Sequence, residues 1–187
     1  MTLQFKIQLR NISKPPVWRK LIVPDNFSFM KFHQVIQDAF GWYNCHLFEF
    51  SPTGYGSYPV IGIPEPGPDR IAGMQDARKI KLSAIFREPG QCFTYTYDYG
   101  DDWVHKITLE KITDEKRIKA SLLAGTGACP PEDCGGSGGY AELRSILADP
   151  KHPGYQEMKE WLDLDEKETW DAKEFDLEYH QFIVSKV

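Results

Sequence analysis

Long apolar runs, a secretion signal and a basic stripe are all missing from this sequence of 187 residues. No apolar run approaches the roughly 20 residues of a membrane-spanning helix, so we expect no membrane partner. The first residues alternate apolar and polar side chains and lack the basic start and apolar middle of a secretion signal, which predicts a cytoplasmic protein. The net charge is −5 and the Lys and Arg residues are scattered, so nucleic acid is disfavoured as a partner.

Cysteine is also scarce. Four cysteines in a chain of this size without a signal are expected to be free thiols rather than a disulfide frame. Cys129 and Cys134 have the spacing of a zinc-ligand pair, but no second Cys or His pair is properly spaced, so no structural zinc ion is expected. Cys134 stands beside two carboxylates, which should raise the pKa of its thiol and argues against a nucleophilic cysteine.

What the sequence does contain is enough apolar surface for a core: 41% of its residues are hydrophobic and 13% are aromatic. We expect a single α+β domain over residues 1–187, with an antiparallel sheet of hairpins and a helix packed on one face. Alternating side chains predict strands at residues 3–10 and 17–23. A helix is predicted from Ser28, which is a good N-cap, to Gly41, which suits a left-handed C-cap.

The clearest pattern lies in residues 93–110, where two alternating runs flank Gly100, Asp101 and Asp102. This pattern predicts a β-hairpin with one buried face. A loop of three residues is preferred to one of two, because it gathers the odd-numbered aromatic and apolar side chains and His105 on one face. That register pairs Tyr99 with Trp103 and Tyr97 with His105. The residues expected to face solvent are Thr94, Thr96, Asp98, Lys106, Thr108 and Glu110.

Glycine and proline are so frequent at residues 51–73 that we predict a long surface loop there. Loops of this length tend to be mobile or functional. Its Tyr55 and Tyr58, together with Trp42, would offer amphipathic contact surface to a partner. Beyond the loop, a short helix is expected to begin near Ser83.

The part of the chain from about residue 139 to 187 is expected to be helical. Helical spacing of apolar residues appears from Tyr140, again after Pro153, and once more after Asp176, which suits an N-cap. The glycine-rich stretch from Gly125 to Gly139 is expected to hold no regular structure.

Two acidic, glycine-flanked spots carry the chemistry that the sequence offers. The first is the hairpin tip, with Asp98, Asp101, Asp102 and His105, whose oxygen and nitrogen atoms suit a divalent metal. The alternative is conformational: the aspartates would satisfy turn amides and His105 would be a packed core residue. Both interpretations stay open at this level.

The second acidic spot is Glu132 and Asp133, just before the glycine-rich stretch that leads to Tyr140. Two carboxylates would repel a phosphate, and the Gly-Lys-Ser/Thr ending of a P-loop is missing. If the two spots meet in space, Glu132 and Asp133 would complete an oxygen site with the hairpin tip. The alternative is a rigid loop that docks the C-terminal helices.

Four short sequence motifs occur in this order along the chain: Pro16–Arg19 (Pro-Val-Trp-Arg), His33–Trp42, Tyr97–His105, and Pro130–Gly136 followed by Gly139-Tyr140. Together they resemble the plasmid pRiA4b ORF-3-like family, and the likeness covers nearly the whole chain. The resemblance implies a single α+β domain without an established biochemical activity. It also implies an association with mobile elements, because members are often labelled as passenger or resolvase-type proteins.

Two functions follow from these patterns. The favoured one is a cytoplasmic binding or regulatory module that contacts an unknown protein or ligand and needs no cofactor. The alternative is a metal-assisted hydrolase that uses the acidic hairpin tip and the Pro-Glu-Asp loop. Its catalytic candidates are Asp98, Asp101, Asp102, His105, Glu132 and Asp133. Its metal-ligand candidates are Asp98, Asp102, His105 and Glu132.

Overall fold

Eight strands and five helices organise the described part of the chain. The strands are β1 (Thr2–Leu9), β2 (Trp18–Pro24), β3 (Phe48–Ser51), β4 (Ile61–Gly62), β5 (Gln75–Asp76), β6 (Cys92–Tyr97), β7 (Trp103–Thr113) and β8 (Ser121–Thr126). The helices are α1 (Phe29–Phe40), α2 (Leu82–Ile85), α3 (Gly136–Leu147), α4 (Tyr155–Trp161) and α5 (Leu177–Val184). The computed structural model describes residues 1–65, 67 and 71–187, so part of the predicted loop at 51–73 lies outside the described residues.

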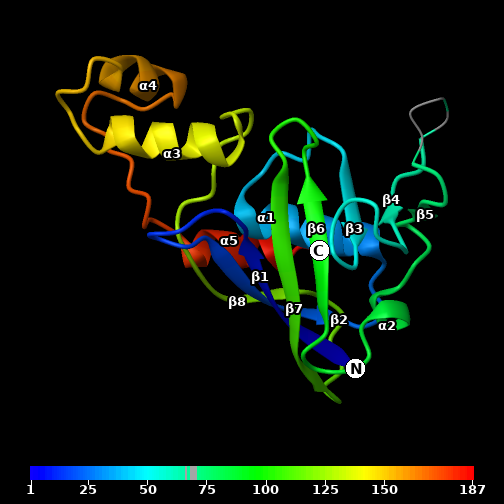
Figure 1. Cartoon of the computed structure of the whole chain (residues 1–187). Helices are drawn as coiled ribbons and strands as arrows, with labels where there is room; N and C mark the ends of the chain where they lie inside the picture. The colour runs from blue at the N-terminus through cyan, green and yellow to red at the C-terminus, as the bar shows by residue number, and fades with distance from the viewer. Residues whose placement is uncertain (66, 68–70) are drawn as a thin grey trace.

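All of the strands join one sheet in the order β5-β4-β3-β6-β7-β1-β2-β8. Neighbouring strands are antiparallel except for the short parallel pair β4 and β5. Helices α1 and α5 lie side by side behind the central strands, and α3 and α4 lie together at one end of the molecule (Figure 1). The architecture is therefore the α+β fold that the sequence predicted.

The central hairpin, β6 and β7, buries the face that alternation predicted, but its register differs. Tyr97 pairs with Trp103, and Tyr95 pairs with His105. The prediction was wrong by two residues because Asp98 belongs to the turn: its backbone φ is 57°, and its carboxylate accepts the Gly100 amide at 2.8 Å. A shift of two residues keeps the strand side chains on their faces, so the core is preserved. Tyr99, expected to pair with Trp103 on the buried face, lies in the turn and is 38% exposed.

The second face of the hairpin is also covered, which alternation did not predict. Thr94 and Thr96 are only 3% and 1% exposed, although both were expected to face solvent. The segment after β3 folds over this face: a Cβ on Gly54 would lie 4.0 Å from Thr94, and the Tyr55 hydroxyl donates to Asp102 at 2.8 Å. The predicted surface loop therefore packs on the hairpin over part of its length.

Helix α1 has the predicted caps, since the Ser28 hydroxyl accepts the Lys31 amide and Gly41 adopts a φ of 93°. Its apolar face is buried against the sheet, and so is His33. The His33 ring lies 2.8 Å from the Tyr95 hydroxyl and 2.6 Å from the Asn44 side-chain oxygen. These contacts fix the segment between α1 and β3, from which the candidate site is built.

Helix α3 begins at Gly136, inside the glycine-rich stretch where no regular structure was predicted. Helix α5 begins at the predicted cap, with the Asp176 carboxylate accepting the Tyr179 amide at 2.9 Å. Among the described residues, none of the helices combines the length and apolar character needed to cross a bilayer.

Candidate functional site

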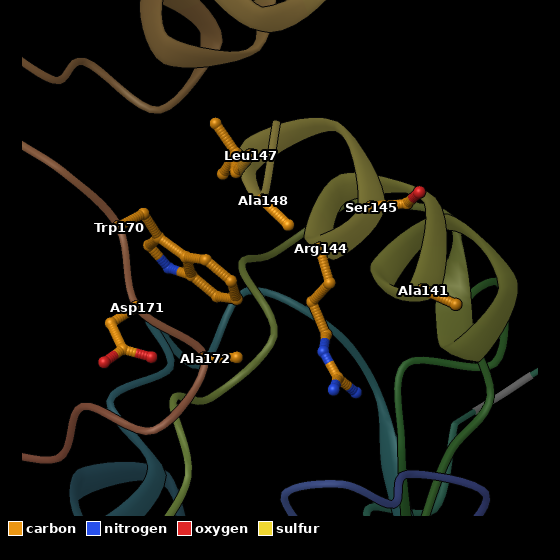
Figure 2. A pocket seen from close by; sticks show the side chains of 8 residues that line it. All are labelled: Ala141, Arg144, Ser145, Leu147, Ala148, Trp170, Asp171 and Ala172. Atoms are coloured by element: carbon orange, nitrogen blue, oxygen red, sulfur yellow. The ribbon is translucent and has the colours of Figure 1, made fainter. Parts of the chain in front are cut away.

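A cavity of about 520 Å³ opens between α3 and the segment at residues 170–172 (Figure 2). Arg144 extends from α3 beside the Trp170 ring, and Asp171 lies on the same segment as Trp170. The Arg144 guanidinium is already engaged, because it donates to the carbonyl groups of Ser13 and Lys14. Among the described residues that line the cavity, Ser145 and Asp171 are the only nucleophilic or metal-ligating side chains.

Trp42 joins the segment after α1 to the loop before α3. Its ring stacks on Phe40 with centroids 5.4 Å apart, and its indole nitrogen donates to the Pro130 carbonyl at 3.0 Å. The side chain is buried, with only 6% of the residue exposed. Trp42 is therefore not available as the contact surface that the sequence suggested, and instead it holds two loops together.

Glu132 is drawn inward by the same two loops. One of its carboxylate oxygens, Oε1, accepts from the Tyr43 amide at 2.9 Å and from the Tyr97 hydroxyl at 2.9 Å. Burial raises the pKa of Tyr97, so its hydroxyl stays protonated and can donate. The Glu132 side chain is only 9% exposed. Its second oxygen, Oε2, is left pointing into the site.

His46 stands at the centre of the site. Its Nε2 atom lies 3.2 Å from an oxygen of Asp133, 3.7 Å from one of Asp98 and 3.9 Å from Oε2 of Glu132. Among the described residues, neither His46 Nε2 nor Glu132 Oε2 has a hydrogen-bond partner, and both atoms are shielded from solvent. Buried polar atoms without partners are rare and call for an explanation, such as an ion.

The spacing of these atoms fits a shared metal ion. Ligand bonds of about 2.1 Å in a tetrahedral site place the ligand atoms about 3.4 Å apart. Two sets of three side chains each offer one ligand atom within 4.8 Å of the others: His46, Asp98 and Asp133 form one set, and Cys45, His46 and Glu132 form the other. His46 is common to both sets, so the two sets lie next to each other around its ring.

Charge in the site is unbalanced without such an ion. Asp98, Glu132 and Asp133 have only His46 within ion-pairing distance among the described residues, and no Lys or Arg there approaches them. Like charges this close repel one another, and a divalent cation would relieve the repulsion. The site is open on one side, because the Asp133 side chain is 73% exposed while that of Asp98 is 9% exposed.

The two acidic spots of the sequence therefore meet, but not every predicted residue joins them. Asp101 accepts the Gly135 amide at 3.1 Å and ties the hairpin tip to the glycine-rich loop. Asp102 accepts the Tyr55 hydroxyl at 2.8 Å. Both carboxylates thus hold neighbouring loops in place rather than satisfying turn amides as the conformational alternative expected; the turn amide of Gly100 is bound by Asp98. Of the tip aspartates, only Asp98 lies within 4 Å of His46.

His105 lies in the core, outside the ligand cluster. It is fully buried, its Nδ1 is 3.3 Å from the Tyr95 carbonyl oxygen, and its ring packs edge-on against Phe40 and Trp42. Burial lowers the pKa of His105 to about 3, so the ring is neutral near pH 7. The packed-core interpretation therefore describes His105, and its proposed role as a metal ligand does not fit the structure.

His46 was not among the predicted site residues. Its position follows from strand pairing: Phe48 pairs with Tyr97, and the Asp98 amide donates to the Leu47 carbonyl at 2.9 Å. Residues just before β3 are thereby placed beside the hairpin turn. The order of the strands in the sheet could not be predicted from the sequence. The proximity of His46 and Asp98 depends on that order, so it could not be predicted either.

The thiols and the loop tyrosines fit their predicted environments. The four cysteines are free, and burial, followed by the nearby Asp101 carboxylate, raises the pKa of Cys134 to about 12. This value leaves Cys134 a poor nucleophile near pH 7. Tyr55 and Tyr58 are 57% and 62% exposed, so both remain accessible to a partner.

Comparison with known proteins gives a family and a fold. The family described as plasmid pRiA4b ORF-3-like protein matches residues 1–179. An uncharacterised protein of Sinorhizobium fredii, y4hQ, is 37% identical over 160 residues, which cover 84% of this chain and 79% of that protein. The crystal structure of a protein of unknown function from Methanosarcina mazei, MM3350, is similar with a TM-score of 0.76 and 30% identity, covering 95% of this chain and 96% of that one. Neither description assigns an activity.

Proposed function

Because this chain belongs to the plasmid pRiA4b ORF-3-like protein family, whose compared members carry no described activity, we propose its function from the site geometry. The chain binds one divalent transition-metal ion through His46, Asp98, Glu132 and Asp133. The observation that carries this proposal is the pair of shielded, unpartnered atoms His46 Nε2 and Glu132 Oε2, which face each other at 3.9 Å.

The donor set indicates which ions fit. One imidazole nitrogen with carboxylate oxygens suits Zn²⁺ or Mn²⁺, whereas Mg²⁺ and Ca²⁺ prefer oxygen ligands alone. The thiol of Cys45, close to both His46 and Glu132, would favour Zn²⁺ further. Tyr97 acts on the ion indirectly, because its hydroxyl holds Oε1 of Glu132 and so orients the ligating Oε2.

The sequence patterns connected metal binding with the hydrolase alternative, but a metal site is also compatible with a binding or regulatory module. An ion held by these four residues would join three segments: the loop before β3, the hairpin tip and the loop before α3. The exposed Tyr55 lies at the same tip through its hydrogen bond to Asp102, so ion binding would also order the surface offered to a partner. A cytoplasmic location and an association with mobile elements stay predictions.

Metal-assisted hydrolysis is a second candidate function, favoured by one specific observation. Asp133 belongs both to the ligand cluster and to the lining of a cavity of about 360 Å³ between α3 and α4. An ion with a position open to solvent lowers the pKa of its bound water and can activate it as a nucleophile. The cavity would hold the substrate next to that position.

Thermal melting of chelator-treated protein with and without added Zn²⁺, Mn²⁺ or Mg²⁺ tests the proposal. An ion at a hundredfold excess over its Kd stabilises the folded state by about 2.7 kcal/mol. For a chain of this size that is a rise in melting midpoint of about 5–11 °C. We expect this rise with Zn²⁺ or Mn²⁺ and a smaller one with Mg²⁺.

The variant His46→Ala should lose the shift, and His152→Ala, which removes an exposed histidine outside the cluster, should keep it. An equal shift in both variants, or none in the unmodified protein, would overturn the metal site. Hydrolysis is tested separately by offering the zinc-loaded protein a chromogenic ester and a chromogenic phosphodiester. Binding of zinc without turnover of either compound would retain the metal site and remove this second function.

A further inference from the structure

A third hollow lies beside the start of α1, and its lining is cationic, in contrast to the acidic candidate metal site. It measures about 400 Å³, and no carboxylate is found among the described residues that line it. The cationic residues that line it come from α1, from the turn after β5 and from the loop before β8; they are Lys31, Arg78, Lys79, Lys81 and Arg117. Five cations around one hollow are unexpected in a chain whose net charge is −5.

The two arginines of this hollow are already paired, and the three lysines are not. Arg78 forms a bidentate pair with Asp76, with N–O distances of 2.8 and 2.9 Å. Arg117 lies 2.8 Å from Glu115. Among the described residues, Lys31, Lys79 and Lys81 have no carboxylate within ion-pairing distance. Three of the residues that line the hollow therefore carry ammonium groups without a carboxylate partner.

We propose that this hollow binds a small molecule that carries two or more phosphate groups. Carboxylate ligands bind best to the planar guanidinium group of arginine, but both guanidinium groups here already form ion pairs. Lysine ammonium groups bind phosphate as point charges, so the unpaired lysines favour a phosphate ligand. One donor is also spare, since Nε of Arg117 is shielded from solvent and has no partner among the described residues. A concave site of this size suits a small ligand.

Side chains rather than the helix end would make the contacts. The first amides of α1 are taken: Phe29 donates to the Ile80 carbonyl at 2.9 Å, Met30 to the Ala77 carbonyl at 2.9 Å, and Lys31 to the Ser28 hydroxyl at 3.2 Å. The Lys31 ammonium is held in place over the Phe27 ring, 4.7 Å from its centroid. The binding energy would therefore come from the lysines and disappear with them.

This hollow is separate from the proposed metal site. It adjoins Ser28 at the start of α1, whereas His46 follows the end of that helix. The 12 residues of α1 span about 18 Å, so a ligand at one end does not reach residues at the other. Loss of one site should leave the other intact.

Isothermal titration of chelator-treated protein with pyrophosphate, at low salt, tests the proposal. Chelator treatment is needed because pyrophosphate binds metal ions. We expect saturable binding that weakens as salt is added. The double variant Lys79→Ala/Lys81→Ala should lose affinity by roughly a hundredfold, since each charge-assisted contact contributes about a factor of ten. The matched control Lys151→Ala/Lys173→Ala removes two exposed lysines elsewhere and should bind as the unmodified protein does.

His46→Ala should also bind pyrophosphate normally, which distinguishes failure here from failure of the metal site. Three results would overturn the proposal: no binding at millimolar pyrophosphate, equal binding by the Lys79→Ala/Lys81→Ala variant, or an equal loss in the control variant. A single-stranded oligonucleotide serves as a comparison ligand. If it binds through the same lysines more tightly than pyrophosphate, the small-molecule ligand is wrong.

Discussion

Replacing Asp98 with asparagine should stabilise the metal-free protein and abolish the stabilisation by metal. A carboxylate oxygen of Asp98 and one of Asp133 lie within 4.8 Å of each other. Two unit charges at that distance repel by about 1 kcal/mol in water and by about 3.5 kcal/mol at an effective dielectric constant of 20. The side chain of Asp133 is mostly exposed, so the lower figure applies.

The fold should tolerate this substitution. Asp98 has a φ of 57°, and asparagine is one of the few residues that adopts this conformation readily. Its side-chain oxygen can still accept the Gly100 amide, which Asp98 now accepts at 2.8 Å. Relief of about 1 kcal/mol should therefore appear as a rise of about 2–4 °C in the melting midpoint of the chelator-treated protein.

The assay is thermal melting at mildly alkaline pH, with and without zinc. Asp163→Asn is a matched control, because Asp163 has a φ of 55° and lies outside the cluster. We expect Asp98→Asn to melt higher than the unmodified protein without zinc and to gain little when zinc is added. If Asp98→Asn melts lower without zinc and keeps the full zinc-dependent shift, Asp98 is a structural turn residue and the repulsion argument fails.

Three further predictions concern the surroundings of the site. Tyr97→Phe removes the hydroxyl that donates to Glu132 at 2.9 Å, and zinc affinity measured by competition with a chelating dye should fall about 10- to 100-fold. Gly136→Ala would place a Cβ 2.5 Å from the Asp101 carbonyl oxygen, at a backbone φ of 65°, so both the stability of the protein and its zinc affinity should fall. Gly138→Ala is the control: a Cβ there would have no atom within 4 Å, so the substitution should be neutral or stabilising. Burial lowers the pKa of His33 from 6.5 to about 4 and that of His105 to about 3. As the pH falls below about 6.5, these histidines are protonated in the unfolded chain before they are protonated in the folded one, so the urea midpoint should fall between about pH 6.5 and pH 4. A midpoint that does not change over this range would contradict this prediction.

Local patterns predicted much of the fold. The odd-numbered residues at 93–97 and 103–109 are buried because alternation in a strand has a fixed period of two, whichever register is adopted; Tyr99 lies in the turn and is exposed. The caps of α1 and α5 were recognisable because Ser28 and Asp176 satisfy backbone amides within their own turns. Such features depend on neighbours in sequence, so they can be predicted from it.

Features that depend on distant parts of the chain were not predictable in the same way. The hairpin register changed because Asp98 closes the turn with its own side chain, which alternation does not report. Thr94 and Thr96 are covered by a segment some forty residues earlier in the chain. Three of the four proposed ligands, Asp98, Glu132 and Asp133, were predicted from the sequence, but His46 could be placed only from the pairing of β3 with β6.

Anomalous diffraction from crystals of the zinc-loaded protein tests the central claim most directly, because it locates the ion without reference to stability. The proposed site predicts one strong peak about 2.0–2.2 Å from His46 Nε2 and from carboxylate oxygens of Asp98, Glu132 and Asp133. A peak between Cys129 and Cys134, or none beside His46 in crystals soaked with zinc, would contradict it.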